Sequence, residues 1–345
     1  MRRGSIFLTI LAAFAASPAA ASPTSPDRPA AEIARDPAAR IEAAMVRYGQ
    51  WLARASEIEL RVQQRLMGLQ PAWQQAQRLP MPEGLRSIRN YVSESLASID
   101  AADAEVAALT LPELDVFPLP EDLRPPELLR QVRQLNRDIR AVVADFLPLI
   151  DAMRSNPQAI AGIAVRLFTN LRLVFETQLV LMRASQAAIP REQADWEIAG
   201  FEISFLRAAQ RILQAVDPVR IRVDARLPAD LIAIADDLDG YIARAETKLT
   251  AQLDQLDEET AAAERLADAA HASLLRRSRA VVVISRDAFP HARQLSVSLR
   301  RGAESLRGRA LTPDLLSRVF TPLRTIRSGF DDVALRQAQV LAESN

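Results

Sequence analysis

The chain of 345 residues contains no cysteine, two histidines and a single lysine, Lys248. Without cysteine it cannot form a disulfide scaffold, a zinc finger, an iron–sulfur site or a thiol nucleophile. His271 and His291 are too few for a metal site built from several imidazoles. Aromatic residues make up only 5% of the chain, while alanine, leucine and arginine are abundant. This composition is typical of helices rather than strands.

Common catalytic motifs are also missing. The chain has no Gly-x-Ser-x-Gly turn, no glycine-rich phosphate loop that ends in Gly-Lys and no His-Glu-x-x-His pair. We therefore expect a protein that is not an enzyme and that carries no cofactor. A hydrolase built on a pair of carboxylates stays open, because such a pair leaves no short sequence motif.

The N-terminus has the pattern of a secretory signal. Arg2 and Arg3 precede the uncharged apolar run from Ile6 to Ala16, and the small residues Ala19 to Ala21 follow. The apolar run is shorter than the roughly 20 residues that cross a bilayer. We predict a signal peptide at residues 1–21, cleaved after Ala21. The predicted location is the periplasm of a Gram-negative cell, with secretion into the medium as the second choice.

The next part of the sequence predicts a linker and an N-terminal helical bundle. Four prolines within residues 22–37 predict a flexible linker. Between residues 38 and 217, apolar residues recur every three or four positions, which predicts helices. We expect Pro71 and the proline-containing segment Leu79–Gly84 to end the first helical region, and Pro148 to bend or stop the third helix. The expected helices are Arg40–Leu69, Leu85–Leu109, Glu127–Leu147, Gln158–Ile189 and Arg191–Val216.

Residues 218–345 predict a region of long helices that packs on this bundle. Alternating apolar and charged residues from Pro218 to Leu227 indicate a short extended segment, with Leu111–Leu119 as its candidate partner. No proline occurs from Ala229 to Phe289, so this span predicts either one long helix or a helical hairpin. A seven-residue apolar repeat supports helix packing there. Its members are Ile242, Leu249, Leu256, Ala263 and Ala270.

The predicted fold is therefore all-α. It is an elongated bundle of several helices, with a long helix or a helical hairpin in its C-terminal half and at most two short extended segments. The most apolar stretch, Ile160 to Met182, carries Arg166, Arg172 and Glu176. Because charges near a helix centre oppose membrane insertion, we expect no transmembrane segment in the mature chain.

Residues 235–246 align in part with the twelve-residue calcium loop. Asp237 and Asp239 take its third and fifth positions, and Glu246 takes the twelfth. Ala235 stands where the loop has its first carboxylate. The favoured interpretation is therefore an acidic helical turn rather than a calcium site.

A second group of candidate ligands comes later in the chain. Glu264, Asp268 and His271 are spaced to share one face of a helix. Together they can bridge one divalent ion, or they can form a solvated face of salt-bridging side chains. The second interpretation is favoured, so we expect no bound metal.

Charge is divided unevenly between two neighbouring segments. Residues 229–270 contain eleven acidic and three basic residues, whereas residues 271–345 contain thirteen arginines and six acidic residues. One explanation is that the basic segment folds back on the acidic one. The alternative is that the arginines bind an anionic partner, because the guanidinium group binds phosphate or carboxylate at two points. The candidate patch consists of Arg276, Arg277, Arg279, Arg300, Arg301, Arg307 and Arg309.

These features favour a non-enzymatic exported protein that works by contact, as a scaffold, adaptor or accessory subunit of the bacterial envelope. Its expected partner is an envelope protein or an anionic envelope surface. Nucleic acid is disfavoured because the signal removes the chain from it and the basic segment has few interleaved aromatics. The alternative is a periplasmic carrier that holds a lipid or other apolar ligand between helices Gln158–Ile189 and Arg191–Val216. A homo-oligomer stays open.

Overall fold

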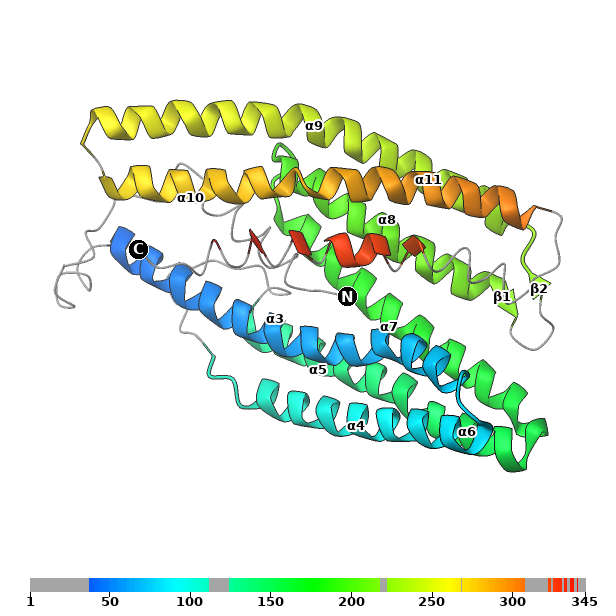
Figure 1. The fold of residues 1–345 in the computed structure, drawn as a ribbon. Helices are drawn as coiled ribbons and strands as arrows, with labels where there is room; N and C mark the ends of the chain where they lie inside the picture. The colour runs from blue at the N-terminus through cyan, green and yellow to red at the C-terminus, as the bar shows by residue number, and fades with distance from the viewer. Residues whose placement is uncertain are drawn as a thin grey trace.

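The computed structural model describes residues 37–111, 124–217, 222–267 and 269–307, with separate positions between 322 and 340. The predicted signal peptide 1–21 and the linker up to residue 36 lie outside the described residues. The fold is an all-α bundle of several helices, as predicted (Figure 1). Its elements are α3 (Pro37–Ala76), α4 (Met81–Ala107), α5 (Pro125–Ala144), α6 (Phe146–Ser155), η2 (Pro157–Ala159), α7 (Ile160–Ala188), α8 (Ala194–Ala215), β1 (Val216–Asp217), β2 (Arg222–Val223), α9 (Leu227–Arg265), α10 (Ala269–Ser285) and α11 (Ala288–Leu306).

Prolines account for several helix boundaries. Pro82, Pro125 and Pro228 lie in the first turns of α4, α5 and α9, where the missing N–H breaks no intrahelical bond. Pro148 acts differently, because its ring clashes with the carbonyl group four residues earlier. That carbonyl belongs to Ala144, where α5 ends before α6 begins at Phe146. The predicted stop near Pro148 is therefore confirmed.

The prediction that Pro71 ends the first helix is wrong. Helix α3 continues through Pro71 to Ala76. Pro71 is exposed, so it lies on the side of α3 away from the core. The apolar residues Leu69 and Ala76 on either side of it are buried in the core shared with α4. We infer that this packing outweighs the loss of one backbone hydrogen bond at Pro71.

The proline-free segment forms a helical hairpin, one of the two predicted alternatives. Helix α9 ends at Arg265, and the chain reverses through Leu266 and Ala267, which has a positive φ of 56°. Helices α10 and α11 then run antiparallel along α9 (Figure 1). Four members of the seven-residue repeat lie on the buried side of α9, whereas the fifth, Ala270, lies in α10. Ile242, Leu249, Leu256 and Ala263 are all at most 6% exposed.

The predicted extended segment is described in part. Within the described residues, Arg222 and Val223 form strand β2, which pairs antiparallel with Val216 and Asp217 of β1, and helix α9 begins at Leu227. Apart from Leu111, the candidate partner Leu111–Leu119 lies outside the described residues, so that pairing stays a prediction.

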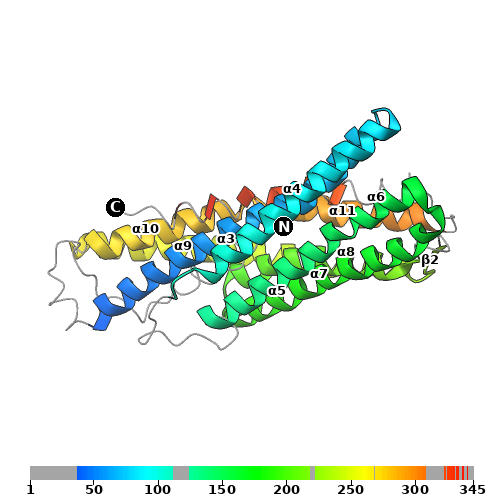
Figure 2. The same cartoon turned by 90° about the horizontal axis from the view of Figure 1, so that it is seen from below.

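The buried apolar side chains form two clusters. One joins residues of α8, α9, α10 and α11 with parts of α3 and α7, and the other joins residues of α3, α4, α5 and α6 with Val174 of α7. Helix α7 thus contributes to both, and it lies between α5 and α8 (Figure 2). The division into domains 38–217 and 218–345 stays a prediction.

Within the described ranges, no helix combines the length and the apolar character needed to cross a membrane.

Candidate functional site

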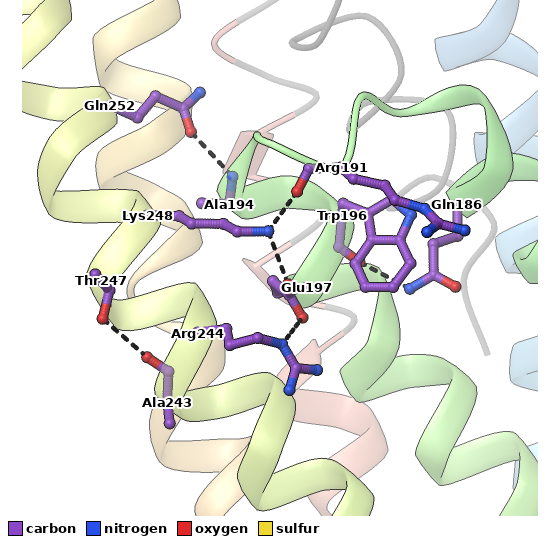
Figure 3. Close-up of polar contacts among 10 residues, drawn as sticks. All are labelled: Gln186, Arg191, Ala194, Trp196, Glu197, Ala243, Arg244, Thr247, Lys248 and Gln252. Carbon is purple, nitrogen blue, oxygen red and sulfur yellow. Dashed lines mark hydrogen bonds and ion pairs between the residues drawn. The ribbon is translucent and has the colours of Figure 1, made fainter.

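Charged and aromatic side chains gather where the α7–α8 turn meets the middle of α9 (Figure 3). We call this group the cation–aromatic cluster. It consists of Arg191, Trp196, Glu197, Tyr241, Arg244 and Lys248.

The local sequence explains how the cluster is positioned. Asp195 and Glu197 lie in the first turn of α8, where carboxylates complement the helix dipole. On α9, Tyr241, Arg244 and Lys248 recur at intervals of three and four, which places them on one face of the helix. Further along the same face, the side-chain oxygen of Gln252 accepts a 3.4 Å hydrogen bond from the Ala194 backbone N–H. The start of α8 is therefore fixed against α9.

Glu197 is the buried centre of the cluster. Its side chain is 2% exposed and binds two cations of α9. Arg244 Nε donates to one carboxylate oxygen at 3.0 Å, and Lys248 Nζ donates to the other at 2.8 Å. Lys248 Nζ also donates to the backbone carbonyl of Arg191. These charge-assisted bonds offset the cost of burying the carboxylate.

Arg244, Lys248 and the neighbouring Arg191 also lie against aromatic rings. Arg191 Cζ and Lys248 Nζ are 5.7 and 5.8 Å from the centre of the Trp196 ring. Arg244 Cζ is 5.2 Å from the Tyr241 ring, whose centre lies 5.9 Å from that of Trp196. Each such contact contributes about 0.5–1 kcal/mol at partly exposed sites. Trp196 and Tyr241 are both half-buried, so parts of their rings stay accessible.

Asp195 lies behind this surface and is 2% exposed. Burial raises its pKa to about 6, and the neighbouring Gln252 amide opposes this effect only in part. Its side-chain Oδ2 has no hydrogen-bond partner among the described residues. Asp195 is therefore a carboxyl group that ionises within the physiological range.

Gly200 leaves room for the Tyr241 ring. A Cβ atom at position 200 would lie 2.6 Å from Tyr241 Cδ1 and 2.7 Å from Cε1. We expect Gly200→Ala to displace this ring and to lower the unfolding free energy by about 1–3 kcal/mol, despite the higher helix propensity of alanine. Urea denaturation monitored by circular dichroism measures the change.

Gly162 provides the matched control for this prediction. It lies in α7, and a Cβ atom there would meet no atom within 4 Å. Gly162→Ala should therefore raise stability by up to about 1 kcal/mol through helix propensity. If Gly162→Ala and Gly200→Ala raise the free energy of unfolding equally, Tyr241 does not need the space beside residue 200.

The cluster presents charged and aromatic groups that can bind another molecule. Two donors of the only lysine are occupied by Glu197 and by the Arg191 carbonyl. Arg191 and Arg244 are exposed, and in the described part of the chain Arg191 has no carboxylate partner. A guanidinium group beside an aromatic ring can receive a phosphate or a carboxylate attached to a flat or apolar group.

In the structure, both groups of candidate cation ligands are arranged differently from the predicted sites. Asp237, Asp239 and Glu246 lie inside the continuous helix α9, so the loop that would wrap an ion is not formed. Each carboxylate instead pairs with an arginine of α8 or α11.

The shared helix face expected for Glu264, Asp268 and His271 is also wrong, because α9 ends at Arg265. Glu264 pairs with Arg276, Asp268 lies outside the described residues, and His271 lies in α10 with its side chain undescribed. Among the residues that the structure describes, no group of three His, Asp or Glu side chains is placed to hold a metal ion.

The acidic and basic segments pair with each other along the hairpin. As the arginines advance along α10 and α11, their partners step back along α9, as an antiparallel register requires. We call these pairs the charge ladder. Its rungs are Arg276 with Glu264, Arg279 with Asp257, Arg293 with Glu246, and Arg300 with both Asp236 and Asp239.

The candidate arginine patch is therefore divided. Arg276, Arg279 and Arg300 bind acidic residues of α9. Arg277 is half-buried, Arg301 and Arg307 are exposed, and none of these three has an ion-pair partner in the described ranges. Arg309 lies outside those ranges.

A scan of protein-family models, a search of curated proteins and a search of solved structures each found no match to this chain.

Proposed function

We propose that this protein is an exported, non-enzymatic helical protein that acts by contact in the bacterial envelope, as a scaffold, adaptor or accessory subunit. Its export is inferred from the basic head, apolar run and small residues of the first 21 positions. The cation–aromatic cluster is the observation that carries the proposed mode of action.

The cluster differs from the charge ladder in how its charges are matched. On the hairpin, each arginine of the ladder binds a carboxylate of α9. In the cluster, two cations share the buried Glu197, and Arg191 contacts an aromatic ring instead of a carboxylate. Glu192 is the exposed acidic neighbour of Arg191. An anionic group of a partner that binds Arg191 or Arg244 would gain charge-assisted hydrogen bonds and contact with the neighbouring aromatic ring.

Photo-crosslinking in cells tests this proposal. A photoreactive amino acid replaces Glu192 beside the cluster, or Glu304 beside Arg301 and Arg307 on α11; both positions are exposed. We expect an envelope protein to be captured at position 192. Arg191→Gln with Arg244→Gln should reduce that capture at least about tenfold, the effect of about 1.4 kcal/mol of lost binding. Lys248 still pairs with Glu197 in this variant.

The matched control is Arg301→Gln with Arg307→Gln, which removes the same charge from the divided arginine patch. It should leave capture at position 192 unchanged. Flotation with vesicles of phosphatidylglycerol or phosphatidylcholine distinguishes an anionic surface from a protein partner. The proposal fails if neither a protein nor anionic vesicles bind, or if the control variant loses binding as much as the cluster variant.

The carrier hypothesis receives no comparable support. The two helices named for it, α7 and α8, both contribute large side chains to one apolar cluster, among them Phe175, Met182, Phe201 and Phe205. These side chains are at most 6% exposed. Because side chains of the core fill the space between α7 and α8, we propose that the protein acts by contact with a partner and does not carry a ligand between these helices.

A further inference from the structure

Helix α7 has an apolar outward side as well as a buried one. Val174 and Phe175 face the two cores and are at most 6% exposed. Val165, Leu173 and Val180 are 42%, 45% and 59% exposed. Their spacing of seven or eight residues places them along one outward stripe. These three are among the most exposed large apolar side chains of the described residues.

Charged residues of both signs interrupt this stripe. Arg172, Glu176 and Arg183 are exposed, and none of them has an ion-pair partner in the part of the chain that the structure describes. Other arginines nearby are paired, such as Arg166 with Asp145. Arg172 and Glu176 stand four residues apart in the less favourable order, with the base before the acid. Their charges are therefore available to another molecule.

The order of these residues makes the stripe self-complementary. Helix α7 runs from Ile160 to Ala188, so Val174 is its middle residue. Arg172 and Glu176 lie two residues before and two residues after that midpoint. If two copies of α7 pack antiparallel about it, each Arg172 lies opposite Glu176 of the other copy, and the two Leu173 side chains meet near the axis. We propose that α7 binds α7 of a second copy in this way.

A second copy fits this stripe better than other occupants do. Antiparallel packing is the isologous arrangement of a twofold dimer, in which one patch serves both partners. Parallel packing in the same register would place equal charges opposite each other. An anionic lipid surface would meet Glu176 at the middle of the stripe. The inference is independent of the proposed contact function, because the cation–aromatic cluster does not take part in this pairing.

Sedimentation equilibrium of the purified protein tests the inference. We expect the wild-type chain to be a dimer. Glu176→Arg places four arginines at the axis, and Arg172→Glu places four glutamates there, so each should raise the dimer Kd at least about tenfold. The double variant R172E/E176R restores opposite charges and should restore the dimer. An equimolar mixture of the two single variants should form mixed dimers, which no folding defect would produce.

The controls address folding and location. Circular dichroism checks that each variant keeps its helix content. Leu173→Gln should weaken the dimer, whereas Val297→Gln on α11 should not, although Val297 is 47% exposed. A wild-type protein that stays monomeric overturns the inference. So does a dimer that tolerates both single charge reversals.

Discussion

Arg327→Ala is expected to lower the free energy of unfolding by about 3–5 kcal/mol. Arg327 Nη1 lies 3.3 Å from Glu202 Oε2, and the two side chains are 4% and 6% exposed. The guanidinium group also lies 5.6 Å from the centre of the Phe205 ring. The substitution removes the cation that packs against the buried Glu202 carboxylate. Urea denaturation followed by circular dichroism measures the loss.

Two comparisons separate this effect from a general weakening of the C-terminal segment. Arg336→Ala removes an arginine whose pairs with Asp287 and Asp332 are solvent-exposed, so it should cost about 1 kcal/mol or less. Replacing both partners with apolar residues, as in E202L/R327M, should recover most of the stability lost in R327A. If R327A and R336A lower the free energy of unfolding by the same amount, the buried pair contributes no more to stability than the exposed pairs.

Asp195→Asn is expected to stabilise the protein at neutral pH and to have little effect in acid. Burial raises the pKa of Asp195 from 3.8 to about 6. The folded state therefore binds this proton more tightly than the unfolded state, so the contribution of Asp195 to stability is highest below pH 4 and falls as the pH rises to 6. Above pH 6 the penalty of the charged form is complete, about 3 kcal/mol.

Asparagine cannot ionise and escapes this penalty. The unfolding free energy of Asp195→Asn should therefore exceed that of the wild type by about 2–3 kcal/mol at pH 7.5 and match it near pH 4. Asp254→Asn, an exposed change on α9, should show no such divergence. If the Asp195 variant and the wild type differ by a constant amount at every pH, the carboxyl group does not titrate in this range.

Periodicity and proline placement predicted most of the fold. The predicted helix end at Pro71 was wrong because the free-energy cost of a proline inside α3 depends on the side of the helix that it occupies. Tertiary packing decides which side that is. The reversal at Leu266 and Ala267 contains neither glycine nor proline. The position of this reversal depends on how α10 packs antiparallel against α9, and that packing belongs to the tertiary structure.

The candidate site was harder to predict than the fold. The charge division between residues 229–270 and 271–345 correctly indicated pairing, because the ladder joins segments that are close in sequence. The cation–aromatic cluster was missed because Glu197 and its partners Arg244 and Lys248 are 47 and 51 residues apart. Lys248 was the available signal, since one lysine in a chain that otherwise uses arginine singles out its position.

The charge ladder also bears on the order in which the chain assembles. Its rungs join residues only 12 to 64 positions apart, and contacts between near neighbours form quickly. Glu202 and Arg327 are separated by 125 positions, so we expect their pairing to form after the hairpin has closed. We therefore expect the segment that carries Arg327 to complete a core that α8, α9 and α11 have already begun to form.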